Sequence, residues 1–212
     1  MRKKPSAPPR LRDSALSSGA FCGLVLAGGD GSRFGGPKAW ALLPDGRTFL
    51  EACAATLLEA GAVRVIATLP PESSDPEIPG LEALPLPGPG LDMFASLRFG
   101  LDHLIQSEDW ERLAVLPVDH PLVAAASVEA LVAAAGRAVI PSYRGKHGHP
   151  IAIVREVVVS LVCGDLPGPT MREVLRTVGA VDLEVDDPGV VANCNTPAAL
   201  AAALGRGESA QF

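Results

Sequence analysis

The sequence predicts an α/β protein built on an open, mostly parallel β-sheet flanked by helices. Short apolar runs at 22–27, 63–68 and 113–117 are typical of buried strands, and stretches with helical apolar spacing lie between them. This alternation indicates parallel strands joined by right-handed crossovers. The 212 residues are enough for one such domain. Because 48% of the residues are hydrophobic but only 4% aromatic, the core must consist mainly of Ala, Val, Leu and Ile.

The first half of the chain contains two strands and two helices in alternation. They are expected at 22–27 (strand), 49–59 (helix), 63–68 (strand) and 91–104 (helix). Gly61 lies where the first helix should end. The segment 69–91 holds seven prolines, which excludes a central strand or a helix there.

The second half continues the pattern, and Ser127 is the expected N-cap of its first helix. Strands are expected at 113–117, 138–141, 151–154 and 181–185, and helices at 128–135, 156–162, 170–178 and 196–204. In open α/β sheets, ligands bind beyond the carboxyl ends of the strands. The loops after residues 27, 68, 117 and 154 are therefore expected to form the functional site.

Charge and composition narrow the function. Residues 1–20 carry a net charge of +4, and we expect them to form a disordered basic tail. Because the whole chain has a net charge of −6, the remaining residues carry −10. Such an acidic body excludes a nucleic-acid surface. We expect one domain over 21–205 and a second tail over 206–212. No apolar run approaches the roughly 20 residues of a membrane span, and the four scattered cysteines suit a cytoplasmic protein with reduced thiols.

The most informative segment follows the first strand. It holds five glycines in nine positions, at 28, 29, 31, 35 and 36, whose backbone N–H groups can surround an anion. Arg33 and Lys38 add positive charge suited to a polyphosphate, which a merely flexible turn would not need. The segment is neither a P-loop, because Pro37 follows Gly36, nor a dinucleotide fingerprint, because residue 34 is Phe.

The pattern Leu-Ala-Gly-Gly-x-Gly-x-Arg-x-Gly-Gly-Pro-Lys at 26–38 resembles the signature loop of MobA-like nucleotidyltransferases. That family includes molybdenum cofactor guanylyltransferases and cytidylyltransferases, and the resemblance covers about 22–205. It implies a Rossmann-like, nucleotide-diphospho-sugar transferase-like fold. The implied nucleotide-binding residues are Leu26, Ala27, Gly28, Gly29, Gly31, Ser32, Arg33, Lys38 and Ser96.

Asp119 ends a predicted buried strand, where a carboxylate can either hold Mg²⁺ or cap the turn ahead of Pro121. The resemblance favours the metal and makes Arg33, Lys38 and Asp119 the catalytic set. Asn193 and Asn195 are ordinary helix-start residues, but they also resemble the Asn-x-Asn-Thr-Pro of guanylyltransferases. On that basis Asn195 is a second expected metal ligand.

Other motifs point to the second substrate and leave the nucleobase open. Gly-His-Pro at 148–150 resembles the acceptor side of cytidylyltransferase-like members, so Lys146 and His149 are expected to bind the acceptor. A metal pair of His147 and His149 is a weak alternative without a third ligand. Ser-Leu-Arg at 96–98 also resembles the cytidylyltransferase branch, whereas the Asn-x-Asn-Thr-Pro end resembles guanylyltransferases.

The resemblance therefore implies an enzyme that transfers a nucleoside monophosphate from CTP or GTP, with Mg²⁺, to a phosphorylated acceptor. The expected acceptor is molybdopterin, and the expected partner a molybdoenzyme or cofactor-delivery protein, with no nucleic acid and no membrane. Two alternatives stay open. One is a transferase for a sugar phosphate or other small phosphorylated metabolite. The other is an inactive nucleotide-binding protein that handles the cofactor, since residues 193 and 195 carry no acid.

Overall fold

The computed structural model describes residues 19–29, 36–166 and 170–208. Its strands are β1 (Phe21–Leu26), β2 (Arg64–Leu69), β3 (Leu81–Pro85), β4 (Arg112–Pro117), β5 (Ala138–Tyr143), β6 (Lys146–His147), β7 (Ile151–Val154) and β8 (Val181–Glu184). Its α-helices are α1 (Phe49–Glu59), α2 (Met93–Leu104), α3 (Ala125–Ala133), α4 (Arg155–Cys163), α5 (Met171–Val178) and α6 (Pro197–Glu208). Two 3₁₀ helices are η2 (Lys38–Trp40) and η3 (Pro188–Val191). Among these residues, no helix combines the length and apolar character needed to cross a membrane.

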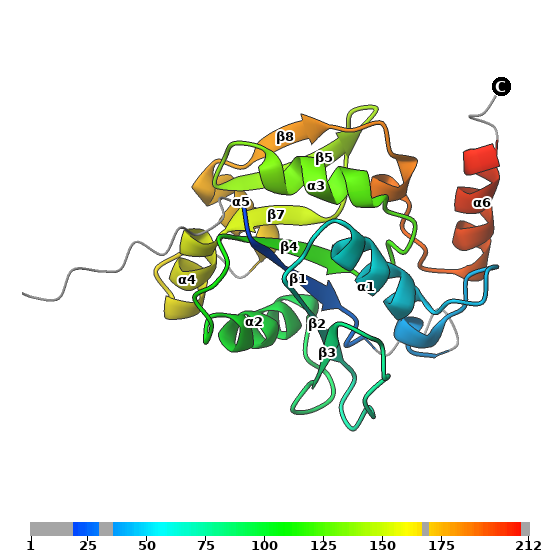
Figure 1. Ribbon diagram of the computed structural model, residues 1–212, viewed down its shortest axis with the longest axis horizontal. Coiled ribbons are helices and arrows are strands. Elements are labelled where there is room, and N and C mark those ends of the chain that lie inside the picture. The colour runs from blue at the N-terminus through cyan, green and yellow to red at the C-terminus, as the bar shows by residue number, and fades with distance from the viewer. Residues whose placement is uncertain (1–18, 30–35, 167–169, 209–212) are drawn as a thin grey trace, which may run out of the picture.

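The eight strands form one mixed sheet in the order β3-β2-β1-β4-β7-β5-β6, with β8 paired to β5 (Figure 1). Strands β3, β2, β1 and β4 are parallel, and β7 runs antiparallel to both β4 and β5. Helices α1 and α3 pack on one face, and α2, α4 and α5 on the other. The predicted fold class, an open and mostly parallel sheet flanked by helices, is confirmed.

Strand β1 shows how the sequence builds both halves of the core. Its side chains alternate between faces, as a strand requires. Val25 packs in the cluster around α1, while Cys22 and Leu24 pack in the cluster around α2, α4 and α5. Gly23 faces α1, and a Cβ there would lie 2.8 Å from Leu57 Cδ1. The absent side chain therefore lets α1 lie close to the middle of the sheet.

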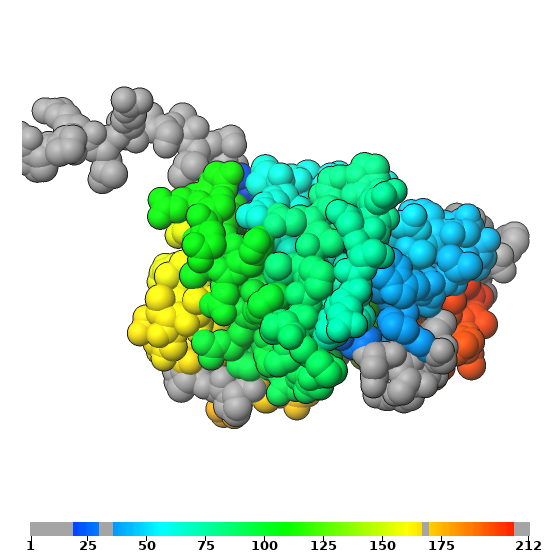
Figure 2. Space-filling model, turned by 90° about the horizontal axis from the view of Figure 1, so that it is seen from below, coloured from blue at the N-terminus to red at the C-terminus, as the bar shows by residue number. Residues whose placement is uncertain are grey.

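The proline-rich segment contains a strand that the sequence analysis did not expect. Leu81–Pro85 forms β3, paired in parallel with β2 alone, at the edge of the sheet. An edge strand makes ladder hydrogen bonds on one side only, so it tolerates proline at its end. This edge and α2 dominate the face shown in Figure 2, in teal and green.

Two expectations about the second half were wrong. The loop after residue 154 was expected at the ligand-binding edge, but β7 is antiparallel and Val154 pairs with Arg112, at the start of β4. The loop before β7 lies at that edge instead. Ser127 was expected to cap a helix starting at 128, but α3 begins at Ala125 and Ser127 lies inside it.

A buried carboxylate from a distant segment takes over the capping role at α3. Asp187 is 8% exposed and accepts hydrogen bonds from the backbone N–H of Ala124 (2.9 Å) and the hydroxyl of Ser127 (2.8 Å). Its other oxygen accepts from the backbone N–H of Gly189 (2.8 Å). A side chain next to η3 therefore satisfies donors at the start of α3 and fixes the segment that leads to α6.

Candidate functional site

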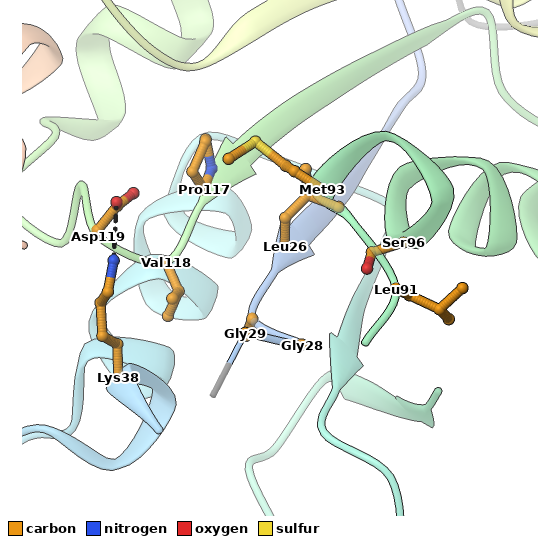
Figure 3. A pocket seen from close by; sticks show the side chains of 11 residues that line it. Leu26, Gly28, Gly29, Lys38, Leu91, Met93, Ser96, Pro117, Val118 and Asp119 are labelled. Carbon is orange, nitrogen blue, oxygen red and sulfur yellow. Dashed lines mark hydrogen bonds and ion pairs between the residues drawn. The ribbon is translucent and has the colours of Figure 1, made fainter. Parts of the chain in front are cut away.

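A pocket opens at the carboxyl ends of the two central strands, β1 and β4, beside the start of α2 (Figure 3). It is lined by Leu26, Ala27, Gly28, Gly29, Lys38, Leu91, Met93, Ser96, Pro117, Val118 and Asp119. This is the edge at which ligands bind in open α/β sheets. The pocket brings together seven of the residues expected at the site: Leu26, Ala27, Gly28, Gly29, Lys38, Ser96 and Asp119.

Lys38 joins three distant segments at one side of the pocket. Its ammonium group lies 3.2 Å from Asp119 Oδ2 and also donates to Asn195 Oδ1. The side chains of Lys38 and Asp119 are only 21% and 14% exposed. An ion pair that is largely screened from water is stronger than one on the surface. Lys38 and the two expected metal-binding residues therefore form one connected cluster.

Backbone contacts fix the position of Asp119. The N–H of Val118 donates to the carbonyl of Leu26 at 3.1 Å, which continues the β1–β4 pairing beyond the strand. The carbonyl of Asp119 then accepts a hydrogen bond of 2.7 Å from the N–H of Cys194. This bond ties the segment before α6 to the end of β4 and brings the neighbouring Asn195 beside Lys38.

Lys38 is placed by the short helix η2. Pro37 is its N-cap residue, and the N–H of Trp40 donates to the carbonyl of Pro37 at 3.1 Å. Ala39 is fully buried in the core around α1, so it anchors the turn from which Lys38 extends. The expected residues Gly31, Ser32 and Arg33 lie outside the described residues.

The glycine segment and Ser96 form the other side of the pocket. A Cβ on Gly28 would lie 2.3 Å from Leu86 Cδ1, so this glycine allows close packing against the segment after β3. A Cβ on Gly29 would meet no atom of the described residues within 4 Å. Ser96 lies near the start of α2 and is 5% exposed. The start of α2 is capped by Asp92, whose carboxylate accepts from the N–H of Ala95 at 2.7 Å.

Two histidines, His120 (buried) and His149 (half-buried), extend the cluster towards β7. His120 Nε2 lies 4.0 Å from Asp119 Oδ1, and the rings of His120 and His149 meet edge to face at 4.9 Å. Burial lowers the pKa of both imidazoles, to about 4 for His149, while the charge of Asp119 acts in the opposite direction. His149 is therefore neutral at pH 7 and offers a hydrogen bond rather than a positive charge.

A tight backbone crossing holds His149 in this place. Its N–H donates to the carbonyl of Val190 at 2.8 Å. At Gly148 a Cβ would lie only 2.1 Å from the Val190 carbonyl oxygen, so the crossing has no room for a side chain. The other expected acceptor residue, Lys146, is exposed on the β5–β6 hairpin. Its hairpin partner is Tyr143, and no contact between Lys146 and the Lys38 cluster is among those of the described residues.

The weaker sequence candidates separate clearly. His147 pairs with Asp182 at 3.0 Å rather than with His149, which leaves the alternative of a histidine metal pair without support. Asn193 is exposed, whereas Asn195 contacts Lys38. In the described part of the chain, no three His, Cys, Asp or Glu side chains gather as a metal cluster.

Four pocket residues were not expected from the sequence. They are Leu91, Met93, Pro117 and Val118. Met93 is 67% exposed and Leu91 is 40% exposed, which is unusual for large apolar side chains. In the sequence, Leu91 and Met93 could have been recognised as two apolar residues that directly follow the Gly/Pro-rich segment, at the start of a predicted helix. They give the α2 side of the pocket an apolar surface.

Comparison with known proteins identifies the family to which this chain is similar. The model of the MobA-like NTP transferase domain matches residues 23–181. A molybdenum cofactor guanylyltransferase of Xanthomonas euvesicatoria is 32% identical over 184 residues, covering 84% of this chain and 90% of that protein. The crystal structure of a protein from Mycobacterium sp. strain JC1 has a TM-score of 0.68 at 26% identity and covers 88% of this chain and 98% of that one.

A manganese complex of a Mycobacterium tuberculosis protein has a TM-score of 0.59 at 22% identity, covering 78% of this chain and 88% of that one. This likeness concerns the fold. The family model spans the glycine segment, Lys38 and Asp119, and the Xanthomonas relative matches over most of both chains. The chain therefore belongs to the MobA-like NTP transferase family, as its glycine segment predicted.

Proposed function

We propose that this protein is a molybdenum cofactor guanylyltransferase, which transfers GMP from GTP to the phosphate of molybdopterin and releases pyrophosphate. The observation that carries the proposal is the convergence of Lys38, Asp119 and Asn195 beside the pocket that contains the glycine segment. The name of the Xanthomonas relative supports the guanylyl group and the acceptor. The Asn-x-Asn-Thr-Pro segment at 193–197 agrees with this choice of nucleotide.

The residues at this site fit a divalent cation. Asp119 and Asn195 already direct two oxygen atoms at one cation, the ammonium group of Lys38. Carboxylate and amide oxygens are the ligands that Mg²⁺ and Mn²⁺ prefer. Because Mg²⁺ usually keeps several waters and binds substrate phosphates, two protein ligands are enough. The metal would neutralise negative charge on the phosphate oxygens, and the related manganese complex is consistent with such a site.

The reaction needs no general base from the protein. A phosphate oxygen of the acceptor is already ionised at pH 7 and attacks the α-phosphorus of GTP. A new O–P bond forms while the bond to the β-phosphate oxygen breaks, and pyrophosphate leaves with the electron pair. The task of the protein is to align the two substrates and to stabilise developing charge. We assign Lys38, together with Arg33 and the loop amides, to the triphosphate and the departing pyrophosphate.

The acceptor is proposed to approach from the side of β5 and β7. His149 offers a neutral imidazole there, and Lys146 offers a cation on the neighbouring hairpin. His120 fills the space between His149 and Asp119 and so shapes the boundary between acceptor and metal.

A thermal-shift panel of GTP, CTP, ATP and UTP, each with and without Mg²⁺, tests the nucleotide. A ligand at 100 times its dissociation constant adds about 2.7 kcal/mol of stability, which raises Tm by roughly 5–10 °C in a domain of this size. We expect a Mg²⁺-dependent shift with GTP. A shift with CTP alone would instead favour transfer of CMP. Ser-Leu-Arg at 96–98 resembles the cytidylyltransferase branch that catalyses that reaction.

Turnover is tested by pyrophosphate release with molybdopterin as acceptor. Lys38→Ala and Asp119→Asn should each lose about 10²–10³ in kcat, the usual effect of removing one electrostatic contact to the transition state. Asp186→Asn is the matched control, because Asp186 is an exposed carboxylate outside the pocket. Turnover with a sugar phosphate but not molybdopterin would replace the acceptor. Nucleotide binding without turnover on either acceptor would favour the inactive cofactor-handling protein.

A further inference from the structure

The ammonium group of Lys38 occupies the position between the two proposed metal ligands. It lies 3.2 Å from Asp119 Oδ2 and donates to Asn195 Oδ1 at the same time. It therefore neutralises the one carboxylate of the proposed metal site and engages its one amide oxygen. Among the described residues, the other ion-pair partner of Asp119 is His120, whose Nε2 lies farther away, at 4.0 Å from Asp119 Oδ1.

We propose that Lys38 competes with the divalent metal for Asp119 and Asn195, so that the free metal binds weakly and enters the site together with the nucleotide. This inference rests on the proposed function, because it concerns the same site. It adds a second role for Lys38: besides holding the triphosphate, this side chain couples metal binding to nucleotide binding.

Geometry and charge both support competition. A divalent metal binds oxygen ligands at about 2.0–2.6 Å, so a metal held by Asp119 and Asn195 would need the space that the ammonium group occupies between the same two oxygens. The ion pair with Lys38 also cancels the negative charge that would attract the metal. Because the side chains of Lys38 and Asp119 are mostly buried, this charge effect is screened less than at the surface.

A triphosphate can remove the competition. Lys38 lines the same pocket as Gly28 and Gly29, where we place the phosphates. Several phosphate charges nearby attract the ammonium more strongly than one carboxylate and one amide do. The long lysine side chain can then turn towards the phosphates while η2 stays anchored by Ala39. The Asp119 carboxylate is then no longer paired with Lys38 when the metal arrives with the nucleotide.

The test measures binding of Mn²⁺ alone, by electron paramagnetic resonance, to wild-type protein and to Lys38→Met. We expect the variant to bind Mn²⁺ at least about fivefold more tightly, the lower end of usual coupling between linked sites. Lys38→Arg, which keeps the positive charge, should bind as weakly as the wild type. Arg47→Met is the matched control: it removes a cation from an exposed ion pair with Asp45 and should not change Mn²⁺ binding.

A double variant, Lys38→Met with Asp119→Asn, locates the metal. Loss of the tighter binding in the double variant would support the inference. Equal or weaker Mn²⁺ binding in Lys38→Met, with binding still dependent on Asp119, would overturn the competition but leave the proposed function standing. Mn²⁺ binding that does not depend on Asp119 in any variant would overturn both the competition and the proposed metal site. Circular dichroism of each variant confirms that it is folded.

Discussion

The strongest test of how the site is supported is removal of the Asp187 carboxylate. In the Asp187→Ala variant, three donors lose their acceptor: the N–H groups of Ala124 and Gly189 and the hydroxyl of Ser127. Water can replace the bond to exposed Ala124, but Gly189 is buried and Ser127 is only 6% exposed. An unsatisfied buried donor costs about 1–3 kcal/mol. We therefore expect a loss of about 3 kcal/mol in the free energy of unfolding.

Urea unfolding at pH 7, followed by circular dichroism, measures this loss directly. Thermal unfolding should show Tm lowered by roughly 6–12 °C, at about 2–4 °C per kcal/mol. Ser127→Ala removes one donor with its bond and should cost only about 1 kcal/mol. Asp186→Ala is the control, because Asp186 is adjacent to Asp187 but its own carboxylate is exposed. The free energy of unfolding of this variant should stay within about 0.5 kcal/mol of the wild-type value. An Asp187→Ala variant as stable as Asp186→Ala would refute the proposed capping role.

Three further predictions follow from individual residues. Gly148→Ala should lower the free energy of unfolding in urea by about 3 kcal/mol or more, because its Cβ would lie 2.1 Å from the Val190 carbonyl oxygen. Gly88→Ala should cost little, because its Cβ would meet no atom of the described residues within 4 Å. Ellman's reagent should titrate Cys163 alone in the folded protein and all four thiols in denaturant, since the other three are buried; a second rapidly reacting native thiol would contradict this burial. The unfolded chain protonates His149 near pH 6.5 and the folded protein only near 4, so stability should fall as pH drops through this window, by roughly 1 kcal/mol per pH unit. If the urea midpoint of His149→Gln changed with pH between 7 and 5 as much as that of the wild type, the assignment to His149 would be contradicted.

Local patterns were enough to predict where the glycine segment and Asp119 lie, because each follows the end of a single strand; their roles at the site came from the family resemblance. The run 113–117 is apolar throughout, as a strand buried on both faces must be, so the position of Asp119 after its end followed directly. The glycine segment after β1 was equally plain. Both predictions depend only on where a strand ends, which composition and spacing encode.

The remaining features depend on partners that are distant in the sequence. Four apolar residues at 151–154 form a strand but do not encode its direction, and the antiparallel pairing of β7 reversed the edge at which its following loop lies. Similarly, Ser127 has the chemistry of an N-cap, but its hydroxyl donates a hydrogen bond to Asp187, 60 residues away, and α3 begins two residues earlier, at Ala125. β3 was missed because the cost of proline depends on whether a strand is central or at an edge.

The contact between Lys38 and Asn195 spans 157 residues of sequence. A ribosome adds about 5–20 residues per second, so roughly 8–30 s separate the synthesis of these two side chains. During that interval the central strands of the sheet can pair, and Lys38 can meet Asp119, but the amide oxygen that completes the cluster has not been made. A nascent chain can thus pair its central strands before the contact between Lys38 and Asn195 forms. The contact between Lys38 and Asn195 forms only after the segment that follows η3 has folded back onto the end of β4.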